Sequence, residues 1–184
     1  MAKNFILTIS EEYPESYWLK IKMLPVEESG IFKEGVAVGE RIKVCFEAAR
    51  KVNASKLLIY DFFFSDGPNL ISPRLHELMI REGVSGVQFV DADLVLDGMS
   101  HGGYKIFNVI DRSPAINLKE SICEPLLNCM PGGPRWFSKI VLDDGAELSS
   151  DIVRAEEEAA TIVVTSRVKS IFETNSIRGL QFTA

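Results

Sequence analysis

The stretch SPRLHELMIREGVSGVQF, Ser72 to Phe89, carries the clearest structural pattern in this chain of 184 residues. Ser72 is a residue type that caps helix N-termini, and Pro73 follows at the first helical position, where its missing N–H costs nothing. Gly83 suits the left-handed position at which helices end. The apolar stripe of this predicted helix consists of Leu75, Leu78 and Met79. VQFVDADLVL (87–96) then reads as a strand.

A second stretch, TSRVKSIFETNSIRGLQF (165–182), repeats this pattern 93 residues later without a gap. Thr165 takes the place of the cap, and the stripe consists of Val168, Ile171 and Phe172. Any capped helix followed by a strand approaches such a pattern, so convergence is one interpretation. Both copies, however, end in Gly, an aliphatic residue, Gln and Phe, which helix periodicity does not require. We therefore predict an internally repeated helix–strand element over residues 72–90 and 165–183.

Other segments read as short strands and one further helix. Residues 5–9 and 19–22 alternate in the way that strands do. GERIKVCFEAARKVN (39–53) predicts a helix, with a stripe of Ile42, Cys45, Phe46 and Ala49. The remaining predicted strands are KLLIYDFFF (56–64), GGYKIFNVI (102–110), FSKIVLDDGAEL (137–148, ended by an Asp-Gly turn), DIVRA (151–155) and ATIVV (160–164).

These elements predict an α+β fold with mixed, mostly antiparallel sheets and about three helices. The chain is long enough to bury a core without disulfides or metals. We expect a single domain over residues 1–184, or two lobes over about 1–98 and 99–184, each with one copy of the repeat. Cys45, Cys123 and Cys129 match no zinc or redox spacing and are expected to be free thiols.

Charge and hydropathy limit the classes of partner. The net charge is −6 and the pI is about 5.1, which is the wrong sign for binding a phosphate backbone. No segment has the pattern of a signal peptide or a membrane span. We therefore expect a cytoplasmic protein that binds neither nucleic acid nor membrane.

Few residues suggest chemistry. Of the two histidines, His76 lies among charged neighbours on a predicted helix, and His101 lies in SHGGY, expected to be a flexible loop that could present a general base. No nucleophile motif accompanies His101, and PGGP and HGGY lack the residues of a phosphate-binding loop. We expect no cofactor, no metal and no enzymatic turnover.

Carboxylates are the more promising feature. Two groups stand beside the repeated stretches and are the candidate partner-binding residues: Asp91, Asp93 and Asp97, and Asp143, Asp144 and Glu147. Most such groups are merely solvated surface. Together they offer an acidic surface that could attract and dock a basic protein.

Three segments resemble a known family. ISPRLHELMIREGVSGVQF (71–89), YKIFNVIDRSPAINLKES (104–121) and IVVTSRVKSIFETNSIRGLQF (162–182) are similar, in order and spacing, to the eleventh immunity family of bacterial polymorphic-toxin systems. The resemblance covers the chain from about Lys56 onward. It implies a protein that binds a cognate secreted toxin one to one and blocks its active surface, with a nuclease of a type VI or contact-dependent system as the expected toxin.

Two other hypotheses compete with this one. A small cytoplasmic enzyme would have its site around His101 and would lose turnover in His101→Ala. A general acidic scaffold would bind many partners weakly, whereas an immunity protein binds one partner tightly.

Overall fold

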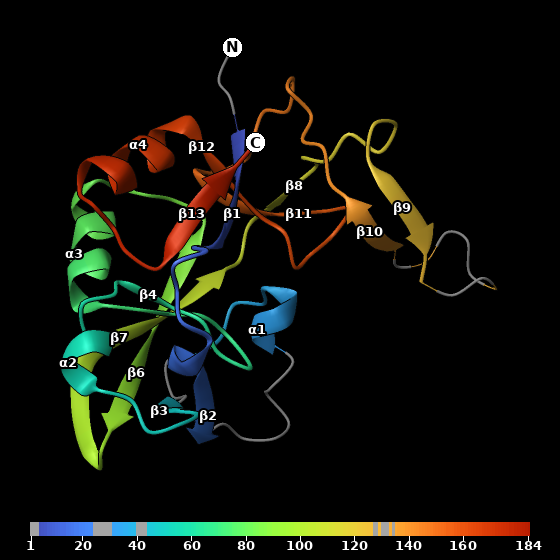
Figure 1. Ribbon diagram of the computed structural model, residues 1–184. Coiled ribbons are helices and arrows are strands. Elements are labelled where there is room, and N and C mark those ends of the chain that lie inside the picture. The colour runs from blue at the N-terminus through green and yellow to red at the C-terminus, as the bar shows by residue number, and fades with distance from the viewer. Residues whose placement is uncertain (1–3, 24–30, 40–43, 127–128, 130–132, 134) are drawn as a thin grey trace.

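The structure is a computed structural model that describes residues 4–23, 31–39, 44–126, 129, 133 and 135–184 (Figure 1). One sheet has six strands in the order β2-β3-β6-β7-β5-β4: β2 (Leu19–Met23), β3 (Val44–Ala48), β4 (Phe62–Phe63), β5 (Leu70–Ile71), β6 (Val87–Leu96) and β7 (Met99–Val109). A second has five in the order β13-β1-β12-β11-β8: β1 (Asn4–Ile9), β8 (Arg112–Ser113), β11 (Ile152–Ala155), β12 (Ile162–Thr165) and β13 (Leu180–Thr183). The remaining pair is β9 (Ile122–Pro125) with β10 (Arg135–Lys139).

The helices are short. They are η1 (Glu15–Tyr17), α1 (Ile31–Glu34), α2 (Ala54–Leu57), α3 (Pro73–Arg81) and α4 (Ser166–Thr174). Among the strand pairs described, β3–β6 and β8–β11 are parallel and the others are antiparallel. The predicted α+β class with mixed, mostly antiparallel sheets is therefore confirmed.

The six-stranded sheet closes into a small barrel. The Leu19 N–H donates to the Phe64 carbonyl at 2.9 Å, and the Asp66 N–H donates to the Leu19 carbonyl at 3.1 Å, so β2 also bonds to the segment that follows β4. The barrel interior is filled with side chains, among them Leu19, Phe46, Phe63, Leu70, Leu94 and Ile106. The contact of Leu19 with the segment after β4 covers part of the β2 edge, which an open sheet would leave exposed.

A second core cluster joins the two sheets beneath the longer helices. It combines side chains of both sheets with the buried stripes of α3 and α4, among them Leu75, Met79, Phe107, Val164, Val168 and Phe172. Figure 1 shows α3 and α4 along the left-hand side of the molecule, beside the strands, with α4 above α3. On the other face of the five-stranded sheet lies a smaller cluster around Ile116, Leu142, Val153 and Val163.

The two helices predicted from the paired stretches are confirmed. Ser72 Oγ accepts from the Leu75 N–H at 3.1 Å, and Thr165 Oγ1 accepts from the Val168 N–H at 3.4 Å, so both caps act as predicted. Gly83 is left-handed with φ +61°. The strands around the two helices are also arranged alike. In the six-stranded sheet, β7 lies between β6, which follows α3, and β5, which precedes it. In the five-stranded sheet, β1 takes the same place between β13, which follows α4, and β12, which precedes it, although β1 comes from the other end of the chain.

An arginine in the first turn of each of these helices, held by an aspartate, bonds to the end of the other helix. Asp61 accepts from Arg74, which also donates to the carbonyl that follows α4 at 3.1 Å. Asp151 accepts from Arg167 at 2.8 Å, and Arg167 also donates to the carbonyl that follows α3. The contacts match, while a common origin of the two segments stays a prediction.

The prediction of a helix over residues 39–53 is wrong. Val44–Ala48 is the strand β3, in which Val44 and Phe46 are buried in the barrel while Cys45 and Glu47 are partly exposed. In so short a run, the apolar residues fit both the spacing of a helix and the alternation of a strand. Pairing with β2 and β6 determines that this segment is a strand. Ile42 lies outside the described residues. Asn53 starts a helix instead of ending one, because its side chain caps α2.

Three other predictions need correction. Residues 56–64 contain the end of α2 and only the two-residue strand β4, and the strand predicted over 137–148 spans Arg135–Lys139. His101 does not lie in a loop but in β7, opposite Leu94 of β6. The single domain and its two-lobe alternative both stay predictions: the boundary between residues 98 and 99 falls in the β6–β7 turn, and β1 belongs to the sheet of the C-terminal strands.

Candidate functional site

The first acidic group lies on the barrel. Asp91 and Asp93 are exposed side chains of β6, separated by the buried Ala92. Asp91 forms an ion pair with Lys105 of β7, and its side chain stays largely exposed to solvent. Asp97 is exposed in the β6–β7 turn, where its φ of +49° is left-handed. The three carboxylates do not converge on one point.

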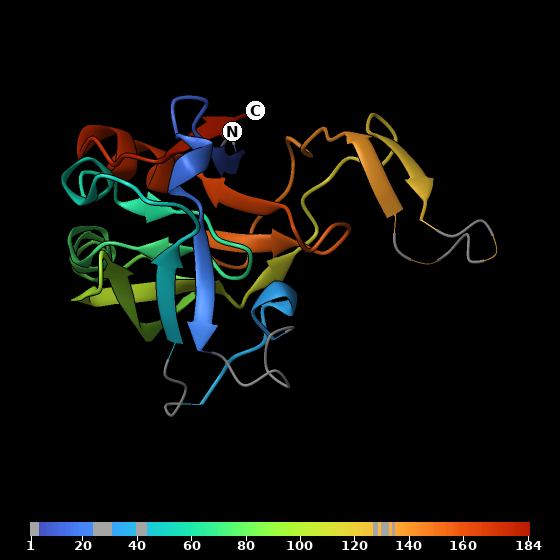
Figure 2. The ribbon, with the colours of Figure 1, turned by 60° about the horizontal axis from the view of Figure 1, so that its bottom comes forward.

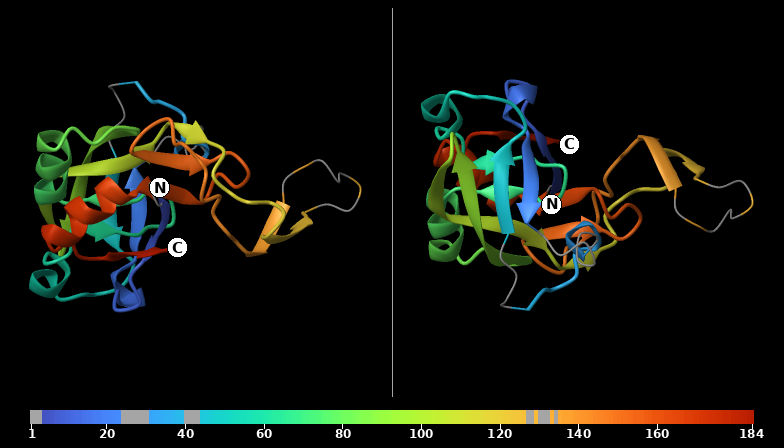
Figure 3. Two further views of the ribbon diagram at one scale, coloured as in Figure 1. Left: turned by 90° about the horizontal axis from the view of Figure 1, so that it is seen from above. Right: turned by 90° about the horizontal axis from the view of Figure 1, so that it is seen from below.

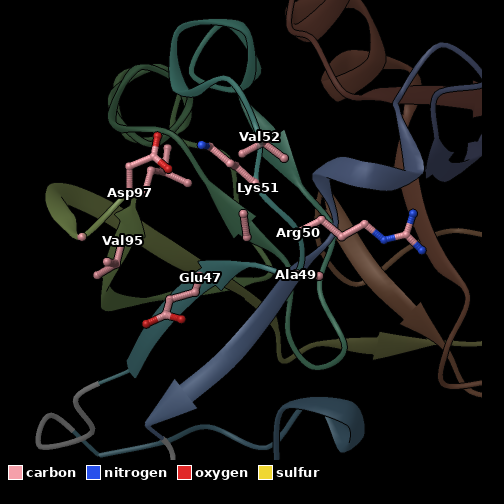
Figure 4. Close-up of a pocket in the computed structure, with 10 residues that line it drawn as sticks. Glu47, Ala49, Arg50, Lys51, Val52, Val95 and Asp97 are labelled. Atoms are coloured by element: carbon pink, nitrogen blue, oxygen red, sulfur yellow. The ribbon is translucent and has the colours of Figure 1, made fainter.

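An open pocket of about 360 Å³ lies beside that turn, between residues 47–52 and 95–98 (Figure 4). Figure 4 shows the Lys51 ammonium turned toward Asp97, whereas the Arg50 guanidinium points away from the pocket. The described lining contains charges of both signs and neither a histidine nor a cysteine. It offers no arrangement of nucleophile and base.

The second acidic group lies where the chain returns from β10. Asp143 Oδ1 accepts from the Gly145 N–H at 2.9 Å, which confirms the predicted Asp-Gly turn. Asp143, Asp144 and Glu147 are all exposed. Asp143 and Asp144 line a cavity of about 380 Å³, whereas Glu147 does not.

The structure adds Glu120 to this second group. It lines the same cavity, together with Asn4, Asn117, Val141, Leu142 and Ala184. Asn117 fixes this side of the cavity, because its side-chain oxygen accepts from the N–H groups of Lys119 and Glu120 at 3.1 and 3.3 Å. Within the described residues, none of the three carboxylates has an ion-pair partner. We call Glu120, Asp143 and Asp144 the acidic pocket.

Sequence reasoning missed Glu120 for a physical reason. It is far from Asp143 in the chain, and the two meet only because Ile116 and Leu142 form a β-bridge between their segments. The available signal was the Asn-Leu-Lys-Glu-Ser pattern, which positions Glu120 through the Asn117 side chain. The first predicted acidic group lies on β6 and in the turn after it, whereas the second lies in the loop between β10 and β11, and the structure does not bring them together.

A buried aspartate forms a further polar cluster. Asp61 accepts from Ser72 Oγ and Arg74 Nε, each at 2.9 Å, and from the Arg178 N–H at 3.1 Å. It lines an open pocket of about 560 Å³ with Tyr104 and both arginines. Its oxygens are already occupied by donors, which suits a structural joint and not a general base.

The histidines have no catalytic partners among the described residues. His101 Nε2 is buried and has no hydrogen-bond partner there. The His76 ring packs against Phe89 with the centroids 4.8 Å apart, and burial, followed by the Lys105 charge, lowers its pKa below the ordinary value. No group of three or more His, Cys, Asp or Glu side chains in the described part of the chain is placed to hold a metal ion.

Comparisons with known proteins do not assign this chain to a family. No family model matches this chain, and no curated protein matches it. The resemblance to the immunity family therefore stays a prediction. None of the helices in the described residues is both long enough and apolar enough to cross a membrane.

Proposed function

We propose that this protein is an immunity protein that binds a cognate secreted antibacterial toxin in the bacterial cytoplasm. It forms a one-to-one complex and covers the toxin's active or substrate-binding surface, without turnover of its own. The expected toxin is a nuclease delivered by a type VI or contact-dependent system. The resemblance of residues 71–89, 104–121 and 162–182 to the immunity family suggests the class.

The acidic pocket is the observation that carries the proposal. Glu120, Asp143 and Asp144 line one cavity without an ion-pair partner in the described chain. A nuclease must expose lysines and arginines to hold phosphates. The carboxylates can receive those side chains, and the net charge of −6 speeds capture by attraction at long range.

The test measures how tightly the purified protein binds the toxin domain encoded beside its gene, at low and at high salt. In the triple variant Glu120→Gln, Asp143→Asn, Asp144→Asn, we expect the Kd to rise about tenfold at low salt. Three exposed pairs of about 0.5 kcal/mol each approach the 1.4 kcal/mol of a tenfold change. The difference should shrink at high salt, because ions screen exposed charges.

The matched control is Asp91→Asn with Asp93→Asn, which removes two exposed carboxylates outside the pocket. Its Kd should rise much less than that of the triple variant, because these two carboxylates can act only through the net charge. Absence of any complex with the wild-type protein would contradict the proposed function. Equal losses in both variants would show that net charge acts without the pocket.

A further inference from the structure

The strands β9 and β10 form a two-stranded ribbon that stands away from the rest of the molecule (Figures 2 and 3). Arg135 pairs with Pro125, Trp136 with Glu124 and Phe137 with Cys123, and the register then shifts beyond Phe137. In the described residues neither strand pairs with a third strand. A ribbon of this kind gains little stability by itself in water, so its projection calls for an explanation.

The two faces of the ribbon differ in exposure. On the inward face, Phe137 is half-buried and packs against the core cluster beneath the five-stranded sheet. On the outward face, Ile122 and Trp136 are 57% and 58% exposed. Leu126, directly after β9, is 62% exposed. The contact of Phe137 orients the ribbon so that Trp136 and its neighbours face solvent.

Such a face is unusual on a protein surface. Single exposed apolar residues are common, but here three large ones gather on one small projecting element. Tryptophan is the residue type most enriched among those that dominate binding energy, and charge is depleted at the centre of interfaces. The outward face of the ribbon thus combines three large apolar side chains with one exposed carboxylate, that of Glu124, which pairs with Trp136 on the same face.

The acidic pocket lies at the base of the ribbon. Glu120 lies two residues before the start of β9, and Asp143 and Asp144 follow β10 after three residues. An apolar face beside unpaired carboxylates fits a partner with an apolar cleft and a basic rim. A second copy of this chain fits poorly, because a twofold contact through this surface would bring the same carboxylates of two acidic molecules together.

We propose that the β9–β10 ribbon is the recognition arm of the protein. The side chains of Ile122, Leu126 and Trp136 enter an apolar cleft of the toxin domain. The acidic pocket then receives lysines or arginines on the rim of that cleft. This inference rests on the proposed immunity function, and it names the surface and the chemistry of the partner.

The test compares matched pairs of variants in the full-length protein, by titration with the purified toxin domain. Trp136→Ala and Ile122→Ala change the arm. Trp18→Ala and Ile80→Ala remove exposed side chains of the same types, 40% and 60% exposed, from the body. We expect Trp136→Ala to weaken binding by about 30-fold or more, mostly through faster dissociation, because residues at interface centres act on the off-rate.

The outcomes separate the two proposals. Both body variants should bind like the wild type, and all four should keep the wild-type circular dichroism spectrum. Tight wild-type binding that neither arm variant weakens would overturn the recognition arm and leave the immunity function standing. Failure of the wild type to bind would overturn both. A wild-type dimer that Trp136→Ala dissociates would assign the arm to a second copy and overturn the inference.

Discussion

Asp61 keeps its charge almost entirely out of water, with 4% of its side chain exposed. It joins the cap of α3, the guanidinium of Arg74 and the backbone N–H of Arg178. The sequence does not predict this buried cluster, because Asp61 stands in an aromatic run and its donors come from two distant segments. A buried charge is held only where donors surround it, and the fold brings them together.

We expect Asp61→Ala to lower the free energy of unfolding by about 3 kcal/mol or more, because it leaves Arg74 and two further donors without their acceptor. Urea denaturation measures the loss. The control is Asp91→Ala, since Asp91 also pairs with a cation but is 88% exposed, and it should lose less than about 1 kcal/mol. Equal losses would show that Asp61 is not a joint.

His76 gives a prediction about pH. Burial and then the Lys105 charge lower its pKa in the folded protein, against the smaller opposite effects of Glu77 and Asp91. The unfolded chain therefore binds the proton more readily, and the protein loses stability as pH falls below about 6.5. Replacing His76 by Gln should reduce this loss between about pH 7 and pH 5 in urea denaturation. An unchanged slope would contradict the lowered pKa.

At the scale of elements, two glycines hold the matching segments against the sheets. Gly86 and Gly179 follow α3 and α4, with φ of +94° and +108°. A Cβ atom at Gly86 would lie 1.9 Å from the Ile152 carbonyl oxygen, and one at Gly179 would lie 2.3 Å from that of Phe62. Only glycine permits this backbone approach, which explains why both matching segments have glycine at this place.

We therefore expect Gly86→Ala and Gly179→Ala each to destabilise the protein by at least about 2 kcal/mol, from strain and steric overlap together. Gly83 is the matched control, because its φ is also positive, at +61°, but nothing lies within 4 Å of its added Cβ. Gly83→Ala should lose about 1 kcal/mol. Thermal unfolding of the three variants checks the order, and a Gly83→Ala loss as large as the other two would contradict it.

At the scale of the whole molecule, local sequence patterns predicted which helices and strands form better than they predicted which strands pair with one another. The caps and stripes of α3 and α4 and the alternation in β1 and β6 are local, and the structure confirms them. Strand β3 was missed because pairing with β2 and β6 determines it. Closure of the barrel depends on Leu19 meeting the segment after Phe63, which no local signal encodes.

In the candidate site, too, local features were predictable from the sequence and contacts between distant segments were not. Exposure of Asp143 and Asp144 in a turn was predictable from Asp-Asp-Gly, but their meeting with Glu120 was not, because it requires the bridge between Ile116 and Leu142. The projecting β9–β10 ribbon could not be predicted from the sequence either. Its sequence contains apolar residues that a folded chain usually buries, and only the structure places Trp136 in solvent.

Rescue from toxicity tests most directly the proposal that this protein neutralises a toxin. The toxin domain encoded beside the gene is expressed in a bacterial host alone, with the wild-type protein, and with its Trp136→Ala variant. The immunity function predicts that cells survive with the wild-type protein, and the recognition arm predicts poorer survival with Trp136→Ala at equal protein levels. Cells that die equally with and without the wild-type protein would contradict the immunity function.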